Sequence, residues 1–259
     1  MSIAGKELLR LGHSKLLIDA EVYLYRAATA SEWEAEWDDG DWTYLCRHQD
    51  AQANFQETIG DIREAAPDHQ PVLVFSDGIS FRYGIWPQYK ANRKKYKRPA
   101  GYRQLIEWVS KAAPSRGWQV IKLPDIEGDD ALGVLYEEGD VIASIDKDML
   151  TLPGMHLRDG EIVGVSRLEA DRNFYRQALT GDATDNYPGC PGYGPVTAER
   201  ALADCSTEVE MWQRVIEAYA KKELSEAYAI TQARCARILR AGEYDLKTHT
   251  PLLWSPPVA

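Results

Sequence analysis

The sequence predicts an α/β fold with a largely parallel sheet, followed by a lobe of helices. In the first part of the chain, short apolar runs typical of buried strands alternate with helix-like segments. From about Arg167 onward the pattern is helical. A chain of 259 residues is long enough for one large core, or for one core with a smaller appended lobe.

Four apolar segments are each expected to hold one buried strand. They are residues 14–20, 71–78, 117–139 and 140–152. The third continues through a loop into a helix at 131–138, and the fourth ends in a helical turn. Residues 156–165 are typical of a hairpin or an edge strand.

Four helices are expected in the last part of the chain. They cover residues 167–179, 195–204, 208–220 and 224–240. An earlier segment, residues 31–42, is acidic and places Trp33 and Trp37 four residues apart. That spacing favours a helix face packed on the core over a ligand site.

The composition is typical of an ordinary globular protein, with 44% hydrophobic and 27% charged residues. The longest apolar runs are too short to span a membrane, and the N-terminus shows no signal-peptide pattern. The four cysteines form no Cys-x-x-Cys pair and no zinc spacing, so we expect reduced, mostly structural thiols. We therefore expect a cytoplasmic protein without a membrane partner.

A basic, aromatic-rich island stands in this acidic chain. The net charge of −10 argues at first against a nucleic-acid partner. Between Asp77 and Glu107, however, there is no acidic residue. The basic residues there are Arg82, Lys90, Arg93, Lys94, Lys95, Lys97, Arg98 and Arg103, interleaved with Tyr83, Trp86, Tyr89, Tyr96 and Tyr102. The island is either a surface that tracks a nucleic-acid backbone and stacks its bases, or a solvated basic loop.

Carboxylates from five separate segments predict a metal site. They are Asp19, Asp77, Glu127, Asp129, Asp130, Asp146, Asp148, Asp182 and Asp185. Several follow predicted strands, and ligands bind at that edge of an open α/β sheet. Asp146 and Asp148 are two residues apart, so on extended backbone both point the same way. Carboxylates gathered there repel one another unless cations neutralise them, and oxygen-rich sites suit Mg²⁺ or Mn²⁺.

Each carboxylate taken alone also has a simpler explanation. Asp129 or Asp130 would serve as a helix cap, and Asp19 would merely end a strand. The pair Asp146 and Asp148 would be solvated charge. The joint occurrence favours the metal site, because all five segments fit one location.

Five stretches, in family order, resemble the 5′-nuclease superfamily of flap endonucleases and 5′→3′ exonucleases. They are "LLIDA", "FSDGISFRYGIWPQYKANR", "EGDDALG", "ASIDKDM" and "LTGDATDNYPGCPGYGPVTAERAL". The most specific parts are "YKANR" and "GDATDNYPGCPGYG". The stretch "QARCARILRAGEYD…LLWSPPVA" and the acidic segment after Asp19 resemble the 5′→3′ exonucleases of short-tailed T-odd bacteriophages.

The resemblance implies a PIN-like (resolvase-like) fold with a helical arch and a helix–two-turn–helix. Residues 1–166 would form the nuclease core, with the arch at about 82–103, and residues 167–259 the helical lobe. It also implies two Mg²⁺ ions, for which Mn²⁺ substitutes. Asp19, Asp77, Glu127, Asp129 and Asp130 would surround the first ion, and Asp146, Asp148, Asp182 and Asp185 the second.

The resemblance assigns roles to the basic residues and to the glycines as well. Lys90 and Arg93 would be catalytic, holding the scissile phosphate at the base of the arch. Arg82 would help to fix the arch. The DNA-binding set would be Arg82, Tyr89, Lys94, Lys95, Lys97, Arg98, Tyr102, Arg103, Gly189, Gly192 and Gly194. The glycine-rich turn would bring backbone amides to a phosphate, with K⁺ as an optional bridge.

A helix starting near Pro195 would then aim its N-terminus at that phosphate. Val196 stands where the family often has a basic residue, so we expect contact mainly through backbone amides.

The implied function is a metal-dependent 5′→3′ exodeoxyribonuclease with structure-specific flap endonuclease and RNA-primer-removing (RNase H-like) activity. Its substrates would be duplex DNA ends, nicks, gaps, flaps and RNA–DNA hybrids, in phage replication, recombination or degradation of host DNA. We expect a monomer. Two alternatives stay open: a non-catalytic DNA-binding scaffold with a vestigial metal site, and a PIN-like ribonuclease.

Overall fold

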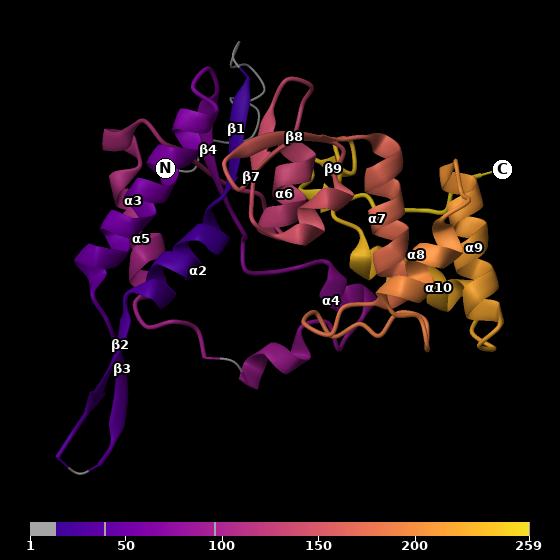
Figure 1. Cartoon of the computed structure of the whole chain (residues 1–259), viewed down its shortest axis with the longest axis horizontal. Coiled ribbons are helices and arrows are strands. Elements are labelled where there is room, and N and C mark those ends of the chain that lie inside the picture. The colour runs from indigo at the N-terminus through magenta and orange to yellow at the C-terminus, as the bar shows by residue number, and fades with distance from the viewer. Residues whose placement is uncertain (1–13, 39, 96, 259) are drawn as a thin grey trace.

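The computed structural model describes residues 14–38, 40–95 and 97–258, and its centre is a six-stranded sheet (Figure 1). The strand order is β5–β4–β1–β6–β7–β8. The strands are β1 (Lys15–Asp19), β4 (Gln70–Phe75), β5 (Gln119–Lys122), β6 (Val141–Ala143), β7 (Gly154–Arg158) and β8 (Glu161–Val165). The neighbouring strands β5, β4, β1, β6 and β7 all pair in parallel. Strand β8 pairs antiparallel with β7. This confirms the predicted α/β fold, including the hairpin at 156–165.

Helices cover both faces of the sheet, which explains why its strands are continuously apolar. In β1, Leu16 and Ile18 pack on one side and Leu17 on the other, and all three are fully buried. The first side is covered by α2 (Ala20–Ala30), α3 (His48–Ala65) and α5 (Tyr102–Ala112), and the second by α6 (Gly128–Leu135). A strand buried on both faces needs apolar residues at every position.

A separate hydrophobic cluster holds the helices of the C-terminal part together. These helices are α7 (Arg167–Thr180), α8 (Pro195–Leu202), α9 (Glu208–Ala220) and α10 (Glu226–Ala236). Capping boxes start α7 at Ser166 and α9 at Thr207. Helix α10 ends earlier than predicted, because the following chain is extended and the Leu239 amide donates to Asp130 instead.

Residues 31–42 do not form the predicted helix face. They contain β2 (Glu32–Glu36), which pairs with β3 (Trp42–Cys46) in an antiparallel hairpin that projects from the molecule (Figure 1). Trp33 is 40% exposed and Trp37 55% exposed, so neither packs in the core. Acidic residues alternate along β2, which is the period-two pattern of a strand. The helix prediction was therefore wrong.

The segment between β4 and α5 spans the space between α5 and the C-terminal helices (Figure 1). It contains α4 (Arg82–Ile85) and the 3₁₀ helix η1 (Ala91–Lys95). The remaining elements are η2 (Pro114–Arg116), η3 (Lys147–Thr151), β9 (Tyr244–Asp245) and β10 (Thr250–Pro251). Within the described residues, no helix combines the length and apolar character needed to cross a membrane.

Candidate active site

A cleft of about 1950 Å³ lies at the carboxyl ends of the parallel strands, where this class of fold binds ligands. Eight of the nine predicted metal-binding residues line it: Asp19, Asp77, Glu127, Asp129, Asp146, Asp148, Asp182 and Asp185. The topology explains the meeting of four of them, because β4, β1 and β6 are neighbours: Asp19 is the last residue of β1, Asp77 follows β4, and Asp146 and Asp148 follow β6.

Asp19, Asp146 and Asp148 form a region of strong negative potential. Burial raises the pKa of Asp19 to about 6, although a hydrogen bond from Ser144 acts to lower it. The negative charge of Asp146 adds to the rise. The pKa of Asp148 is likewise raised to about 6, first by burial and then by Asp146, Asp182 and Asp185. Burial and mutual repulsion therefore make the charged forms of Asp19 and Asp148 unfavourable.

A tight turn presents Asp182 and Asp185 to this region. Asp182 Oδ1 accepts hydrogen bonds from the amides of Thr184 (2.6 Å) and Asp185 (3.2 Å). The main chain of Asp182 also pairs with Tyr187 in both directions. Gly181 has a φ of +65°, and a Cβ there would lie 2.4 Å from the Tyr187 carbonyl oxygen. This turn therefore requires glycine before Asp182.

Glu127, Asp129 and Asp130 gather at the start of α6, with ligand oxygens within 4.8 Å of one another. Glu127 and Asp130 form a capping box that fixes the first turn. Burial raises the pKa of Asp129 well above its usual range, and the charges of Asp130 and Glu127 raise it further. Burial alone would raise the pKa of Glu127 as well, but Arg82 and Lys90 hold it below its ordinary value.

Arg82 and Asp130 form a buried ion pair behind the cleft. Arg82 Nη1 and Nη2 lie 2.6 and 2.8 Å from the two Asp130 oxygens, and Arg82 Nε donates to the Cys235 carbonyl (3.0 Å). Arg82 is 1% exposed, so it belongs to the predicted DNA-binding set only indirectly, and its contacts fit the predicted role of fixing the arch. Asp130 is fully buried, and its oxygens are occupied by protein donors, so it supports Arg82 rather than facing the cleft.

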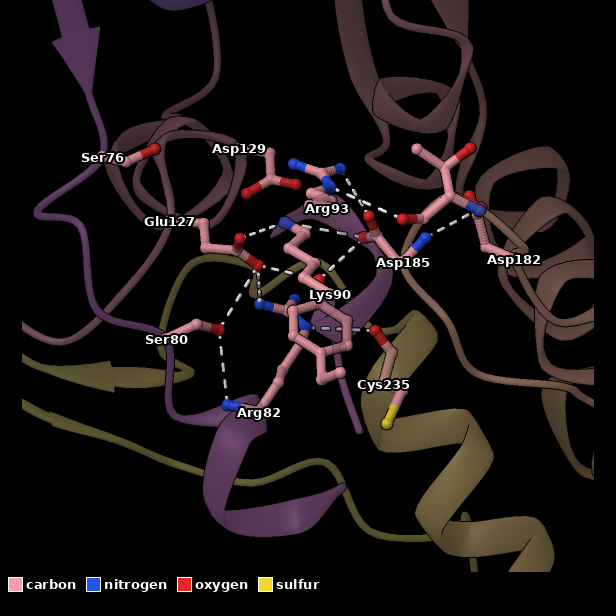
Figure 2. A network of polar contacts seen from close by, with 12 residues as sticks. Ser76, Ser80, Arg82, Lys90, Arg93, Glu127, Asp129, Asp182, Asp185 and Cys235 are labelled. Atoms are coloured by element: carbon pink, nitrogen blue, oxygen red, sulfur yellow. Dashed lines mark hydrogen bonds and ion pairs between the residues drawn. The ribbon is translucent and has the colours of Figure 1, made fainter. Parts of the chain in front are cut away.

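Ion pairs join the basic island to carboxylates of the cleft (Figure 2). Lys90 Nζ forms an ion pair with Glu127 Oε1 and lies 3.6 Å from Asp185 Oδ2. Arg93 Nη2 lies 2.5 Å from Asp185 Oδ1. Lys90 has a φ of +54°, a left-handed conformation that is uncommon for a long side chain and is often found at functional sites.

The remaining residues of the island divide into two groups. Lys97 and Arg98 are exposed and line the cleft, and Arg103 is exposed on α5 but does not line it. Tyr89 and Tyr102 are buried, at 3% and 5% exposure, so their rings are not open to stack on bases as predicted. The side chains of Lys94 and Lys95 lie outside the described part of the structure.

The glycine-rich turn lies beside the cleft, and Gly194 lines it. Gly189 has a φ of +66°, and its amide donates to Gln232 Oε1 (3.0 Å) in α10. Gly192 has a φ of +81°, and a Cβ there would lie 3.6 Å from Lys222 Nζ.

Sequence reasoning missed Lys222, because it approaches Gly192 from the turn between α9 and α10. It also missed five charged residues that line the cleft: Glu21, Arg26, Lys122, Lys147 and Arg176. A signal existed for Glu21, which follows Asp19 by two residues and accepts a hydrogen bond from Ser76 (2.5 Å).

The donor set of the cleft fits hard divalent cations. Its candidate ligands are carboxylate oxygens drawn from separate segments. Burial, with added repulsion from neighbouring carboxylates, raises the pKa of three of them: Asp19, Asp129 and Asp148. Such oxygen-only surroundings suit Mg²⁺ or Mn²⁺ better than metals that prefer nitrogen or sulfur.

The sequence and fold have known relatives. A family described as "5'-3' exonuclease, N-terminal resolvase-like domain" matches residues 14–174. The exodeoxyribonuclease of Enterobacteria phage T3 is 30% identical over 93% of this chain and 92% of its own length. The exonuclease of Escherichia phage T7 is 29% identical over 93% of both proteins.

Solved structures share the fold at lower identity. The 5′-exonuclease of phage T5 with bound zinc aligns with a TM-score of 0.59 and 15% identity, over 86% of this chain and 93% of that one. The T5 flap endonuclease in a complex with DNA and metal ions aligns with a TM-score of 0.57, 15% identity and coverage of 86% and 90%. These likenesses confirm the PIN-like fold. Together with the family match and the phage T3 relative, they show that this chain belongs to the family of 5′–3′ exonucleases with a resolvase-like N-terminal domain.

Proposed function

We propose that this chain is a Mg²⁺-dependent 5′→3′ exodeoxyribonuclease that hydrolyses phosphodiester bonds with two metal ions. One observation carries the proposal: carboxylates from five chain segments line a single cleft, and Lys90 and Arg93 stand beside them. A scaffold without catalysis has no need for so many converging charges, which cost stability when bare.

The carboxylates of the cleft divide into two proposed ligand groups. Asp19, Asp77, Glu127 and Asp129 would hold the first ion, and Asp146, Asp148, Asp182 and Asp185 the second. When bound, the ions supply an activated water and neutralise charge on the attacking and leaving oxygens. Asp130 is assigned a supporting role, because Arg82 already occupies its oxygens.

Lys90 and Arg93 are proposed to hold the scissile phosphate. Lys90 contacts one carboxylate of each group, Arg93 pairs with Asp185 of the second group, and the Arg93 side chain is 49% exposed. A fixed cation at the reacting phosphate stabilises the charge that develops in the transition state. Lys97 and Arg98, farther along the same segment, would guide the 5′ strand toward them.

The glycine-rich turn is proposed to grip the duplex. Within the described residues, the amides of Gly192, Gly194 and Val196 donate no hydrogen bond, so they are available to a phosphate. They adjoin the first turn of α8, whose dipole favours an anion. We also propose K⁺ as a bridge at this turn. The turn directly follows Asp182 and Asp185, so duplex grip and metal site share one segment.

We extend the proposal to 5′ flaps, nicks, gaps and RNA–DNA hybrids, acting as a monomer in phage replication, recombination or host DNA degradation. The T5 relative is named a flap endonuclease and was solved with DNA, as was the Rad2 core, which aligns with a TM-score of 0.50 and 14% identity. The T5 name supports the extension to flap substrates, and the Rad2 complex supports DNA as the substrate. The island over the cleft, with its exposed Lys97 and Arg98, supports a path for a single strand.

A nuclease assay tests the function and separates it from the alternatives. Duplex, nicked, 5′-flap and RNA–DNA substrates, labelled at the 5′ or the 3′ end, are incubated with Mg²⁺ or EDTA and the products are sized. We expect short 5′ products from DNA in Mg²⁺ and no products in EDTA. Binding without cleavage would support the scaffold, and cleavage of RNA alone the ribonuclease.

A further inference from the structure

We infer that Lys90 and the first metal ion exclude each other, so that metal binding displaces the Lys90 ammonium from Glu127 and frees it for the phosphate. This inference rests on the proposed metal site. It gives Lys90 a second role, as the resident counter-cation of the DNA-free cleft, besides the phosphate contact proposed above.

The geometry places the Lys90 ammonium where a metal ion would need to bind. Lys90 Nζ pairs with Glu127 Oε1 and lies 3.6 Å from Asp185 Oδ2, so it bridges the two carboxylate groups (Figure 2). Its side chain is only 13% exposed. An ammonium and a divalent cation on the same carboxylate oxygen would repel each other strongly at such a short separation.

Of the two cations that pair with Glu127, only Lys90 is free to leave. Arg82 is held by Asp130 and by the carbonyl oxygens of Cys235 and Arg237, and it has no route to solvent. Those carbonyls would be left unpaired if it moved. Within the described residues, the Lys90 ammonium forms ion pairs with Glu127 and Asp185 alone, and both are proposed metal ligands. Its other contact is with the face of the Tyr89 ring, 4.9 Å from the ring centre.

The main chain of Lys90 can stay in place while its side chain changes partner. Its amide donates to the Asp185 carbonyl (2.8 Å), which fixes the Cα next to the second carboxylate group. The side chain lines the cleft and has four rotatable bonds with which to swing toward a bound phosphate. The exchange therefore needs only a rotation of one side chain.

Removing the charge of Lys90 should have opposite effects on metal binding and on cleavage, and this distinguishes a competing cation from a mere phosphate contact. Removing a mere phosphate contact would slow cleavage and leave metal affinity in the absence of DNA unchanged. Removing a competing cation raises that affinity. Lys90→Met removes the charge and keeps the length of the side chain. Lys122→Met is the matched control, because Lys122 lines the same cleft and, within the described residues, forms no ion pair with a carboxylate.

The experiment is a Mn²⁺ titration of the DNA-free proteins at pH 7.5, with free Mn²⁺ measured by electron paramagnetic resonance and Mg²⁺ checked by calorimetry. We expect Lys90→Met to tighten the first binding event by about tenfold or more. Lys122→Met should stay within about threefold of wild type, because its charge is more distant and screened. Lys90→Arg, which keeps the charge, should not bind Mn²⁺ more tightly than wild type.

Equal tightening by Lys90→Met and Lys122→Met would overturn the inference, since only the net charge would then matter. Unchanged or weaker binding by Lys90→Met would overturn it as well. Lys90→Gln repeats the test with a second neutral side chain, and circular dichroism checks that each variant is folded. If wild type itself binds no Mn²⁺ or Mg²⁺, the proposed metal site fails, and the inference fails with it.

Discussion

The Tyr89 hydroxyl lies 2.9 Å from Glu127 Oε2 and 2.8 Å from Asp185 Oδ2, and so joins α6 to the loop between α7 and α8. The ring is buried, so this tyrosine is a brace between two carboxylates and not a base-stacking platform. Burial, above all, raises the pKa of Tyr89 far out of the physiological range, and the hydroxyl stays a donor. Together with Lys90 it keeps these negative groups in place without metal.

The adjacent residues Asp129 and Asp130 should affect stability in opposite directions. Asp130→Asn breaks the buried pair with Arg82 and leaves that charge unpaired, which should cost about 3–5 kcal/mol of unfolding free energy. Asp129→Asn removes a carboxylate that burial makes unfavourable and should raise the urea midpoint of the metal-free protein. Urea unfolding in EDTA measures both.

Asp129→Asn should at the same time weaken Mg²⁺ binding, because Asp129 faces the cleft. Equal losses of stability in Asp129→Asn and Asp130→Asn would contradict the distinction between a cleft residue and a supporting residue.

Asp148 should make the stability of the metal-free protein depend on pH. Burial raises its pKa from 3.8 to about 6, with help from Asp146, Asp182 and Asp185 and against Lys147. The folded state therefore binds more protons than the unfolded state between these values, and the stability that Asp148 contributes is lost as pH rises through about 6. Above that range the bare carboxylate destabilises the fold.

Thermal unfolding in EDTA at pH 8 and at pH 5 tests this dependence. Asp148→Asn should raise Tm at pH 8 by about 2–4 °C, which corresponds to about 1 kcal/mol once the partial exposure of the side chain is taken into account. The gain should shrink at pH 5. The same variant should lose cleavage in Mg²⁺ and keep duplex affinity within about tenfold, because DNA grip lies elsewhere. A fully active Asp148→Asn enzyme would remove this residue from the metal site.

Substitutions of Lys90 and Lys97 should affect different steps, the cleavage rate for Lys90 and DNA affinity for Lys97. Lys90→Ala should slow single-turnover cleavage at saturating DNA by roughly 10²-fold, as expected when one charge contact in the transition state is lost. Lys97 is exposed, with its ammonium 5.1 Å from the centre of the Tyr44 ring, and Lys97→Ala should mainly raise the Kd for DNA. An unchanged cleavage rate in Lys90→Ala would favour the alternative interpretation, in which the island is a solvated basic loop.

The sequence was informative where a residue's role depends on its own segment. Asp19 ends β1 and Asp146 follows β6, so their meeting at one sheet edge followed from the topology of parallel strands. It was uninformative where the role of a residue depends on a contact with a residue far away in the sequence. The guanidinium of Arg82 is enclosed because Asp130 and the end of α10 surround it.

Contacts between residues far apart in the sequence also explain two further differences between prediction and structure. The four-residue spacing of Trp33 and Trp37 fits a helix, but pairing with β3 decides the conformation, and that pairing is not visible in residues 31–42 alone. Tyr102 looked like part of a basic, solvent-facing run, yet α5 turns its ring into the core beside α2.

Lys222 should contribute to duplex binding, although no sequence motif singles it out. Its ammonium lies 3.6 Å from where a Cβ of Gly192 would be. Within the described residues, no ion pair or hydrogen bond of this ammonium is found. It therefore places a positive charge beside the free amides at the start of α8, near Val196, which is 71% exposed and uncharged. Lys222→Ala should weaken duplex binding by about three- to tenfold and reduce the salt slope by about one.

The adjacent Lys221 provides the matched control, because Lys221→Ala removes the same charge from the neighbouring exposed position. Fluorescence anisotropy of a labelled duplex, measured from about 50 to 200 mM salt in Ca²⁺, gives both affinity and slope. Introducing Val196→Lys into Lys222→Ala should restore part of the affinity, since it returns a charge to the first turn of α8. If Lys221→Ala and Lys222→Ala lose affinity equally, the effect comes from net charge and not from a phosphate contact at Gly192.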